Sequence, residues 1–382
     1  MAEGVWVAGV ATIPFGRHDG RSVAAMGAEA ARLALADADL APAAVNAGFF
    51  ANVLALRLFG DSTVGQNVFA HVGISGIPVV NVENACTSGS SAAVLACWAI
   101  RAGEADVALV VGAEKMCVPQ LGLLSSGDTD VDTLLGLVTP ASFALRARRH
   151  MAEYGTTARQ MALVAVKNRR HAADNPVAQF RKPITVEEVL ASPLIADPLT
   201  RLQCCPMADG AAAVVLVSDR MARRLGARVR VDAAILCTGS YAPKPDLAQW
   251  ETDYRGARLA YERAGIGPEE VHLVECHDAF SVSEILHYEA LGLCPPGGGG
   301  ALVESGATAL GGRVPVNPSG GLLSRGHPVG VTGVAQIAEI ALHLQGRAGQ
   351  RQVDGARVGV AQCMGGDKAG DAKSCTVMVL SA

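Results

Sequence analysis

Short apolar runs alternate with helical segments along most of this chain, and this alternation limits the folds that it can adopt. In the first part, candidate strands lie at 4–11, 46–53, 78–83 and 106–112, and candidate helices at 22–36, after the N-cap Ser22, and 92–101. Several of the strands are continuous apolar runs, which is typical of strands that helices cover on both faces. The pattern therefore predicts an α/β fold built on a buried, largely parallel sheet.

The alternation stops near residue 115 and returns near 207. Residues 115–206 hold helical, polar and Gly/Pro-rich segments. Then follow candidate strands at 211–218, 229–237, 271–276, 357–362 and 375–380 and candidate helices at 253–264, 281–291 and 331–344. We therefore expect a first half at 1–114 and 207–225, an insertion (loop) domain at 115–206 and a similar second half at 226–382.

The insertion is basic. Within 146–182 there are nine Lys and Arg residues against two acidic residues. A basic surface attracts a phosphorylated substrate, although solvated helix faces or a subunit contact are alternative explanations. The net charge of the whole chain is -4, which gives no signal for nucleic-acid binding.

The sequence also bears on the cellular compartment. The first residues lack the basic and apolar regions of a secretory signal, and no apolar run reaches the roughly 18–20 residues of a membrane span. The ten cysteines have no framework spacing and include no C-x-x-C pair. We therefore expect a cytoplasmic protein with reduced thiols, no membrane partner and no structural zinc site.

One cysteine stands in a chemically favourable place. The stretch 84–91 joins an apolar run to an Ala-rich helix, which puts Cys86 at or just before the helix N-terminus. The N–H groups and the positive dipole end there stabilise a thiolate and an adjacent oxyanion. The small residues of the stretch indicate a closely packed helix. Cys86 is a candidate nucleophile, and the alternative is a buried structural cysteine.

A histidine and an aspartate follow the candidate strand at 271–276. His277 and Asp278 lie at the carboxyl end of that strand, where open α/β sheets bind their ligands. The alternative is a His–Asp pair that caps the helix beginning near Ser281. Because side chains alternate along a strand, Cys276 is expected to point away from His277.

Two further turns carry chemistry. Residues 316–330 present His327 in a loop bracketed by glycines, and Cys363 with Gly365 follows the strand at 357–362. The alternatives are a structural turn with an exposed histidine and an ordinary strand-end turn. Two thiols and two imidazoles on four turns suit nucleophilic acyl transfer with proton shuttling. We do not expect a metal site, because the candidate ligands are far apart in sequence.

Together these segments resemble the thiolase superfamily over essentially the whole chain. The Cys86 turn and helix resemble its nucleophile segment, and residues 317–330 resemble its Asn-Pro-Ser-Gly-Gly…Gly-His-Pro motif. Cys363-Met364-Gly365 matches its Cys-x-Gly motif. His277-Asp278-Ala279-Phe280 resembles the His-Asp-Cys-Phe of the sterol-carrier-protein type. The resemblance implies two similar layered αβαβα halves, with the insertion in the first half.

The resemblance also implies an activity. A thiolase cleaves a 3-ketoacyl-CoA with CoA as co-substrate, or runs the reverse Claisen condensation, without a permanently bound cofactor. His327 would take the proton of Cys86, which would attack the keto carbon, and Cys363 would protonate the departing acetyl-CoA carbanion. The N–H groups of Cys86 and Gly365 would form one oxyanion hole, and His277 and His327 would form a second.

The chain departs from the sterol-carrier-protein type at position 279, which is Ala rather than Cys. Cys363 is therefore expected to be the only acid/base thiol opposite Cys86, and the substrate is left open. Two other readings are a related acyl-CoA C–C bond enzyme, either an acyltransferase of polyketide-like products or a side-chain retro-aldolase, and a non-catalytic scaffold subunit.

The resemblance implies partners as well. Thiolases form homodimers or tetramers, and the strand at 78–83 is the expected pairing edge. Thiolases that resemble this subgroup sometimes work with a small OB-fold/zinc-ribbon subunit. The CoA adenine and phosphates would lie against the insertion, but no cofactor-binding residue follows from the sequence.

Overall fold

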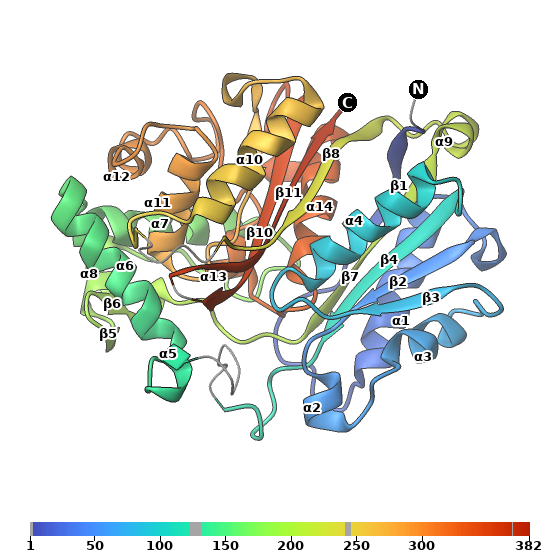
Figure 1. Cartoon of the computed structure of the whole chain (residues 1–382), viewed down its shortest axis with the longest axis horizontal. Coiled ribbons are helices and arrows are strands. Elements are labelled where there is room, and N and C mark those ends of the chain that lie inside the picture. The colour runs from blue at the N-terminus through green and yellow to red at the C-terminus, as the bar shows by residue number, and fades with distance from the viewer. Residues whose placement is uncertain (1–2, 123–130, 241–245, 369) are drawn as a thin grey trace.

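The computed structural model describes residues 3–122, 131–240, 246–368 and 370–382 (Figure 1). Within them, nine strands form one sheet in the order β3-β2-β4-β7-β1-β8-β11-β10-β9. The first-half strands are β1 (Val5–Thr12), β2 (Ala47–Ala51), β3 (Val79–Val82), β4 (Val107–Glu114) and β7 (Gly210–Ser218). The second-half strands are β8 (Val229–Cys237), β9 (Leu273–Glu275), β10 (Val358–Lys368) and β11 (Asp371–Ser381). The short β1–β8 ladder joins the two halves.

The directions of the strands correct one expectation. The pairs β2–β3, β2–β4 and β9–β10 are parallel. The pairs β1–β7, β4–β7, β1–β8, β8–β11 and β10–β11 are antiparallel. The prediction of a largely parallel sheet is therefore wrong. All nine residues of β7 are buried, so an antiparallel strand between covered faces carries the continuous apolar run that usually indicates a parallel one.

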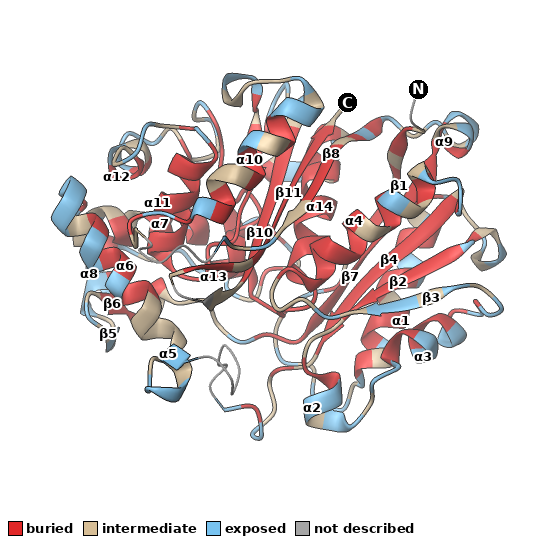
Figure 2. Ribbon diagram, in the orientation of Figure 1, coloured by how far each residue is buried: buried red, intermediate tan, exposed pale blue. Residues whose placement is uncertain are grey.

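Helices lie in three layers around this sheet. On the outer face of the first half, α1 (Val23–Asp37) and α3 (Val64–His71) share one apolar cluster with β2, β4 and β7. On the outer face of the second half, α10 (Glu251–Ala264) and α11 (Ser281–Ala290) pack on β8, β9 and β11. Between the halves, α4 (Ser88–Arg101) and α14 (Thr332–Leu344) share the central core (Figures 1 and 2). The layered α/β fold expected from the sequence is confirmed.

Local sequence signals explain how α1 begins. The Ser22 hydroxyl oxygen accepts a hydrogen bond from the Ala25 N–H at 3.1 Å, as an N-cap does. The expected cap is therefore confirmed. No helix among the described residues is both long and apolar enough to cross a bilayer.

The segment between β4 and β7 contains four further α-helices within the described residues. These are α5 (Val131–Leu134), α6 (Thr139–Tyr154), α7 (Ala158–Ala172) and α8 (Val186–Ala191), with a two-stranded sheet of β5 (Leu194–Ala196) and β6 (Leu199–Thr200). The expectation that 115–206 lacks strands is therefore wrong by this small pair. Part of the segment, 123–130, lies outside the described residues. The exact domain boundaries stay a prediction.

The insertion packs on the second half, although it interrupts the first. Helix α7 contacts α11, α12 (Gly299–Glu304) and α13 (Gly321–Arg325). Two of its basic side chains are anchors, because Lys167 lies 2.7 Å from a Glu284 carboxylate oxygen and Arg169 is buried beside Ser324. Arg146 of α6 is likewise buried and bonds to Asp367. Three of the nine basic residues therefore hold the insertion in place and do not form a surface.

Two glycines bring α4 and α14 into close contact. A Cβ atom on Gly89 would lie 2.9 Å from the Gly330 carbonyl oxygen, and one on Gly333 would lie 2.4 Å from the Ser90 nitrogen. Neither position has room for a side chain without movement of the backbone opposite. The expected close packing of the helix after Cys86 is confirmed, and it sets the first turn of α4 against the start of α14.

We expect Gly89→Ala to lower the free energy of unfolding. Alanine gains up to about 1 kcal/mol of helix propensity, but overpacking against a backbone oxygen costs about 1–3 kcal/mol. Thermal and urea unfolding measure the balance. Ala102→Val, at the exposed end of the same helix, is the control and should change stability by less than about 0.5 kcal/mol. A Gly89→Ala protein more stable than the parent would contradict the close contact.

Candidate active site

Cys86 lies two residues before the first residue of α4. The turn that holds it is fixed by short bonds, since the Thr87 hydroxyl donates to the Asn84 carbonyl at 2.6 Å and the Ser88 hydroxyl donates to the Ala85 carbonyl at 2.6 Å. Ala85 adopts φ 47°, a left-handed conformation that a non-glycine residue rarely takes. The predicted strand–turn–helix is confirmed, and the turn presents Cys86 beyond the end of β3.

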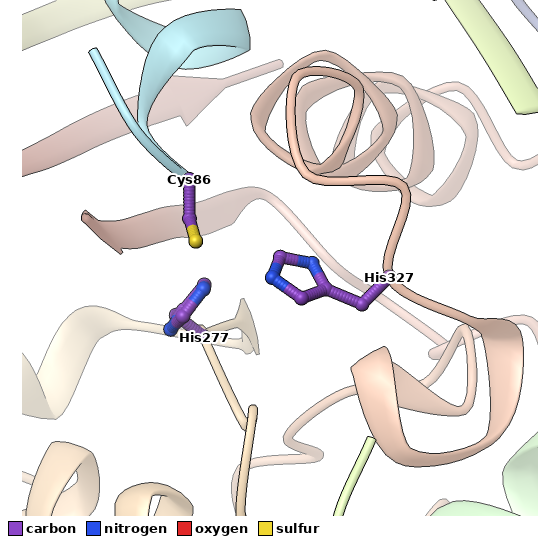
Figure 3. Close-up of side chains that lie close together, drawn as sticks. All are labelled: Cys86, His277 and His327. Atoms are coloured by element: carbon purple, nitrogen blue, oxygen red, sulfur yellow. The ribbon is translucent and has the colours of Figure 1, made fainter. Parts of the chain in front are cut away.

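Two histidines from the second half meet Cys86. His277 follows β9, and His327 lies between α13 and α14. The Cys86 sulfur and one ring nitrogen of each histidine all lie within 4.8 Å of one another (Figure 3). The two imidazole rings stand edge to face with their centroids 5.1 Å apart. Residues 191 and 241 positions away in sequence thus face one thiol.

Cys363 completes the group. Its Sγ lies 3.2 Å from the Cys86 carbonyl oxygen. The expectation of a turn after the strand at 357–362 needs correction, because β10 continues to Lys368 and Cys363 lies inside it, opposite Thr376 of β11. The β10–β11 hairpin therefore brings the second thiol to the nucleophile turn.

The hydrogen bonds of His327 define its tautomer. Its Nδ1 lies 2.7 Å from the Thr332 hydroxyl oxygen, and that hydroxyl lies 3.2 Å from the Pro328 carbonyl oxygen. If the hydroxyl donates to this carbonyl, it accepts from Nδ1–H. Nε2 then has a free lone pair on the side of the ring opposite Nδ1, which is the state that a general base for a thiol needs.

Burial sets the ionisation of Cys86 and His327. It raises the pKa of the Cys86 thiol to about 12, while the N–H groups of Gly366 and of Cys86 itself counteract only part of the effect. Burial, together with the positive charge of Arg325, lowers the pKa of His327 to about 3. The helix N-terminus was expected to favour a thiolate, but desolvation outweighs it, and the resting pair is a neutral thiol and a neutral imidazole.

Two glycines of β10 lie close to the Cys86 turn, and the expected oxyanion-hole role of the Gly365 N–H stays a prediction. Gly365 is needed for close approach, because a Cβ there would lie 2.9 Å from the Asn84 carbonyl oxygen and 3.0 Å from the Thr87 nitrogen. It is the N–H of Gly366, rather than that of Gly365, that lowers the thiol pKa. The second glycine of the Gly-Gly pair was visible in the sequence, but only the hairpin geometry shows which N–H faces Cys86.

His277 offers its ring to a ligand. The side chain is buried, and neither ring nitrogen has a hydrogen-bond partner within the part of the chain that the structure describes. Burial and the nearby His327 and His287 hold its pKa well below the usual range. A neutral imidazole with a free N–H is suited to polarise a carbonyl oxygen.

The neighbours of His277 in the motifs are structural. Asp278 accepts hydrogen bonds from the Leu322 N–H at 2.7 Å and the Asn168 amide at 2.7 Å. It therefore caps α13, and not the helix near Ser281 as the alternative reading held. The Asn317 amide bonds to the Cys276 N–H at 2.9 Å and donates to Glu284 at 2.6 Å.

Two other thiols have clear positions. Cys276 is fully buried, and its Sγ accepts a weak bond from the Asn317 amide at 3.5 Å. Cys205 was not singled out in the sequence, yet its N–H bonds to the Ala279 carbonyl at 2.9 Å. Burial raises the pKa of the Cys205 thiol, and negative charge on Cys86 adds to this. Cys205 therefore lies close enough to Cys86 for charges on the two thiols to interact.

A Cys/His/His group also has the composition of a zinc site. The candidate ligands are Cys86, His277 and His327, and no other such group occurs among the described residues. The unpartnered nitrogens of His277 fit a metal as well as a carbonyl oxygen. The absence of a metal stays a prediction.

Comparisons with known proteins agree with this geometry. Residues 5–220 match the family model of the thiolase N-terminal domain, and residues 237–381 match the model described as thiolase C-terminal domain-like. The chain belongs to the thiolase family. The four groups that converge at Cys86 come from both matched regions.

Three similar proteins are informative. Sterol carrier protein 2 of Oryctolagus cuniculus is 40% identical over 94% of this chain and 70% of that protein. The benzoylsuccinyl-CoA thiolase subunit BbsB of Thauera aromatica is 39% identical over 92% of this chain and 91% of that protein. The solved structure of the Ltp2-ChsH2(DUF35) aldolase is 26% identical, with a TM-score of 0.83, over 99% of this chain and 98% of that one.

The resting state predicts a pH profile. With the thiol pKa raised to about 12, the thiolate fraction should rise about tenfold per pH unit between about pH 6 and 9. Alkylation of Cys86 by iodoacetamide in the free protein, followed by peptide mapping, should show the same slope without a plateau. A plateau in this range would show a preformed thiolate–imidazolium pair and contradict the neutral resting state.

Proposed function

We propose that this protein is a 3-ketoacyl-CoA thiolase, an acetyl-CoA C-acyltransferase that cleaves its substrate with CoA or condenses acyl-CoAs in reverse. The observation that carries the proposal is the meeting of Cys86, His277, His327 and Cys363 at one point. Two thiols and two neutral imidazoles match a reaction with one covalent acyl transfer and two proton transfers. The family membership of the chain supports the same chemistry.

The geometry supports a sequence of steps. His327 takes the Cys86 proton at Nε2 as the sulfur attacks the keto carbon, so charge appears only during the reaction. The N–H groups of Cys86 and Gly365 stabilise the oxyanion of the adduct, and the Gly366 N–H stabilises negative charge on the Cys86 sulfur. The C–C bond then breaks, and Cys363 gives its proton to the acetyl-CoA carbanion. In the last step Cys363 takes the thiol proton of CoA, the CoA sulfur attacks the acyl carbon, and the Cys86 sulfur leaves and regains its proton from His327.

The second oxyanion site lies on the histidine side. In the condensing direction, His277 and His327 polarise the thioester oxygen of the second acyl-CoA while Cys363 removes its α-proton. His277 is suited to this because both of its ring nitrogens are buried without a partner among the described residues. Its lowered pKa keeps the ring neutral, so it donates a hydrogen bond without carrying a charge.

A side-chain retro-aldolase is the second candidate, because the similar solved structure is named an aldolase. Retro-aldol cleavage needs a base and an enolate site but no acyl-enzyme. The pairing of Cys363 with the Cys86 backbone, and of Cys86 with His327, favours the thiolase. The two functions are separated by whether Cys86 becomes acylated.

We also propose partners and a compartment. The reactants are acyl-CoA and CoA, with no bound cofactor, in a cytoplasmic homodimer or tetramer. Similar proteins are named a thiolase subunit and an aldolase with a DUF35 component, which supports a small partner subunit for this chain as well. Degradation of a lipid or aromatic acid is the physiological context that we favour.

Cys86→Ser should abolish the acyl-enzyme and leave the fold intact. Serine is nearly isosteric, but its hydroxyl is a much weaker nucleophile beside the same base. Thiolysis of acetoacetyl-CoA, intact mass and a thermal melt measure the three consequences. Retention of thiolysis within about tenfold, or about 1.4 kcal/mol of barrier, would remove Cys86 from the mechanism.

Three alanine variants distinguish the roles of the other thiols. Cys363→Ala should stop thiolysis but still allow a simple thioester to acylate Cys86, because that step needs no carbanion proton. Cys276→Ala should cost only packing stability, since its sulfur faces Asn317. Cys205→Ala should keep thiolysis within about threefold, or about 0.7 kcal/mol of barrier. An equal loss in Cys205→Ala and Cys363→Ala would overturn the assignment of a single acid/base thiol.

Homo-oligomerisation through β3 is open to a direct test. β3 is an edge strand, and Val80 exposes 44% of its surface. Pairing of two such edges would cover backbone groups that are otherwise open. Light scattering should give a dimer or tetramer that Val80→Lys weakens. The matched control is Leu33→Lys, at an exposed position of α1. A stable monomer of the parent protein at micromolar concentration would contradict the proposal.

A further inference from the structure

A second buried histidine lies behind His277. The His287 side chain on α11 has no solvent exposure. Its Nε2 lies 3.0 Å from the His277 carbonyl oxygen, and its Nδ1 lies 2.6 Å from an Asp253 carboxylate oxygen. A carbonyl oxygen only accepts hydrogen bonds. His287 therefore keeps a proton on Nε2 and donates it to the His277 carbonyl, while Nδ1 pairs with the Asp253 carboxylate.

Gln362 binds the backbone N–H of His277, whereas His287 binds its carbonyl. Its amide oxygen accepts a hydrogen bond from the His277 N–H at 3.0 Å, and its amide nitrogen donates to the second Asp253 oxygen at 2.9 Å. The donor at His277 fixes which end of the amide is the oxygen. The peptide groups before and after the His277 Cα are therefore both held, and both contacts end on the carboxylate of Asp253.

His277 has no other polar anchor among the described residues. Its ring nitrogens are unpartnered, in contrast to His327, whose ring is oriented directly by Thr332. Packing and the backbone must therefore set the direction of the His277 ring. A donor that polarises a thioester oxygen has to be held within roughly 0.5 Å of its productive position.

The same contacts reach the acid/base thiol. Gln362 directly precedes Cys363, and its carbonyl accepts a hydrogen bond from the Gln336 amide of α14 at 2.9 Å. Gln362 thus contacts the backbone of His277 on one side and fixes the strand that carries Cys363 on the other. A shift at Asp253 would be transmitted to both groups that act on the second acyl-CoA.

We propose that Asp253, His287 and Gln362 form a buried clamp that positions His277 for polarising the thioester oxygen of the second acyl-CoA. These are positioning residues, because none of them faces the Cys86 sulfur. The inference rests on the thiolase function proposed above. It separates the two halves of that reaction, since acylation of Cys86 depends on His327, whereas enolate formation depends on His277 as well.

Asp253→Leu tests the clamp, because a leucine side chain of similar size can neither accept a hydrogen bond from Gln362 nor pair with His287. Two rates are measured in the intact protein. Intact mass gives the rate at which acetyl-CoA acylates Cys86. NMR gives the rate at which the acetyl C2 protons of acetyl-CoA exchange with D2O. Removing a residue that orients a functional side chain through a hydrogen bond, as behind metal ligands, typically lowers activity about 10–100-fold. We expect C2 exchange to fall by about that factor, with acylation and the KM for acetyl-CoA changed by less than about threefold.

Gln362→Met keeps the inference falsifiable if Asp253→Leu does not fold. It removes the acceptor of the His277 N–H and the donor to Asp253, but leaves His287 paired with Asp253, and should give the same split with a smaller loss. His150→Gln is the matched control, because His150 is equally buried and bonds to Glu289 and Thr156 away from the site. This control should lower stability without changing the ratio of the two rates.

Three outcomes decide the matter. A selective loss of C2 exchange in the clamp variants, and not in His150→Gln, supports the clamp. Equal losses of both rates, or unchanged exchange in a folded variant, overturn it while the thiolase function stands. A parent protein that neither acylates Cys86 nor exchanges C2 protons overturns the proposed function and the clamp with it.

Discussion

The site depends on the close contact of two helices that carry glycine where they meet. Gly89 of α4 lies under the Gly330 carbonyl, and Gly333 of α14 lies against Ser90. Cys86 precedes one of these helices and His327 precedes the other. A side chain at either glycine would push the two helix starts apart. The Cys86 thiol of the first half therefore meets the His327 imidazole of the second half because glycines leave room where α4 and α14 touch.

The second constraint is the exclusion of water from this group, since His277, His327 and Cys363 are buried and Cys86 is partly buried. Desolvation raises the pKa of the Cys86 thiol and lowers those of His277 and His327. Neutral groups are easy to bury, and the charge needed for attack then arises only when a substrate is present to share it. The ion pair of Lys167 and Glu284 lies outside this group and joins the insertion to α11.

Much of this followed from the sequence, for physical reasons. The strand–turn–helix around Cys86 was predictable because small residues and apolar runs act locally, and the motifs around His327 and Cys363 indicated the same chemistry. The strand directions were not predictable, because helices cover both faces of β7 and hide the difference between parallel and antiparallel strands. The raised pKa of the Cys86 thiol was also not predictable, since desolvation depends on the whole fold, whereas the N–H groups that lower this pKa act locally.

Positions that depend on distant contacts were missed for the same reason. Asp278 caps α13, which is more than 40 residues later in the chain, and Cys205 reaches Ala279 across 74 residues. Nothing in the spacing of His287 or Asp253 indicates that their side chains meet behind His277. Long-range hydrogen bonds of this kind become visible only when the layers are assembled.

The central claim is that Cys86 carries the acyl group through the reaction. The most direct measurement is intact mass with peptide mapping after mixing the protein with a panel of 3-ketoacyl-CoAs of different acyl groups. The account predicts an added acyl mass on the Cys86 peptide for the accepted substrates, which disappears when CoA is added. Consumption of a substrate with Cys86 unmodified under the same quench would contradict it and favour cleavage without an acyl-enzyme.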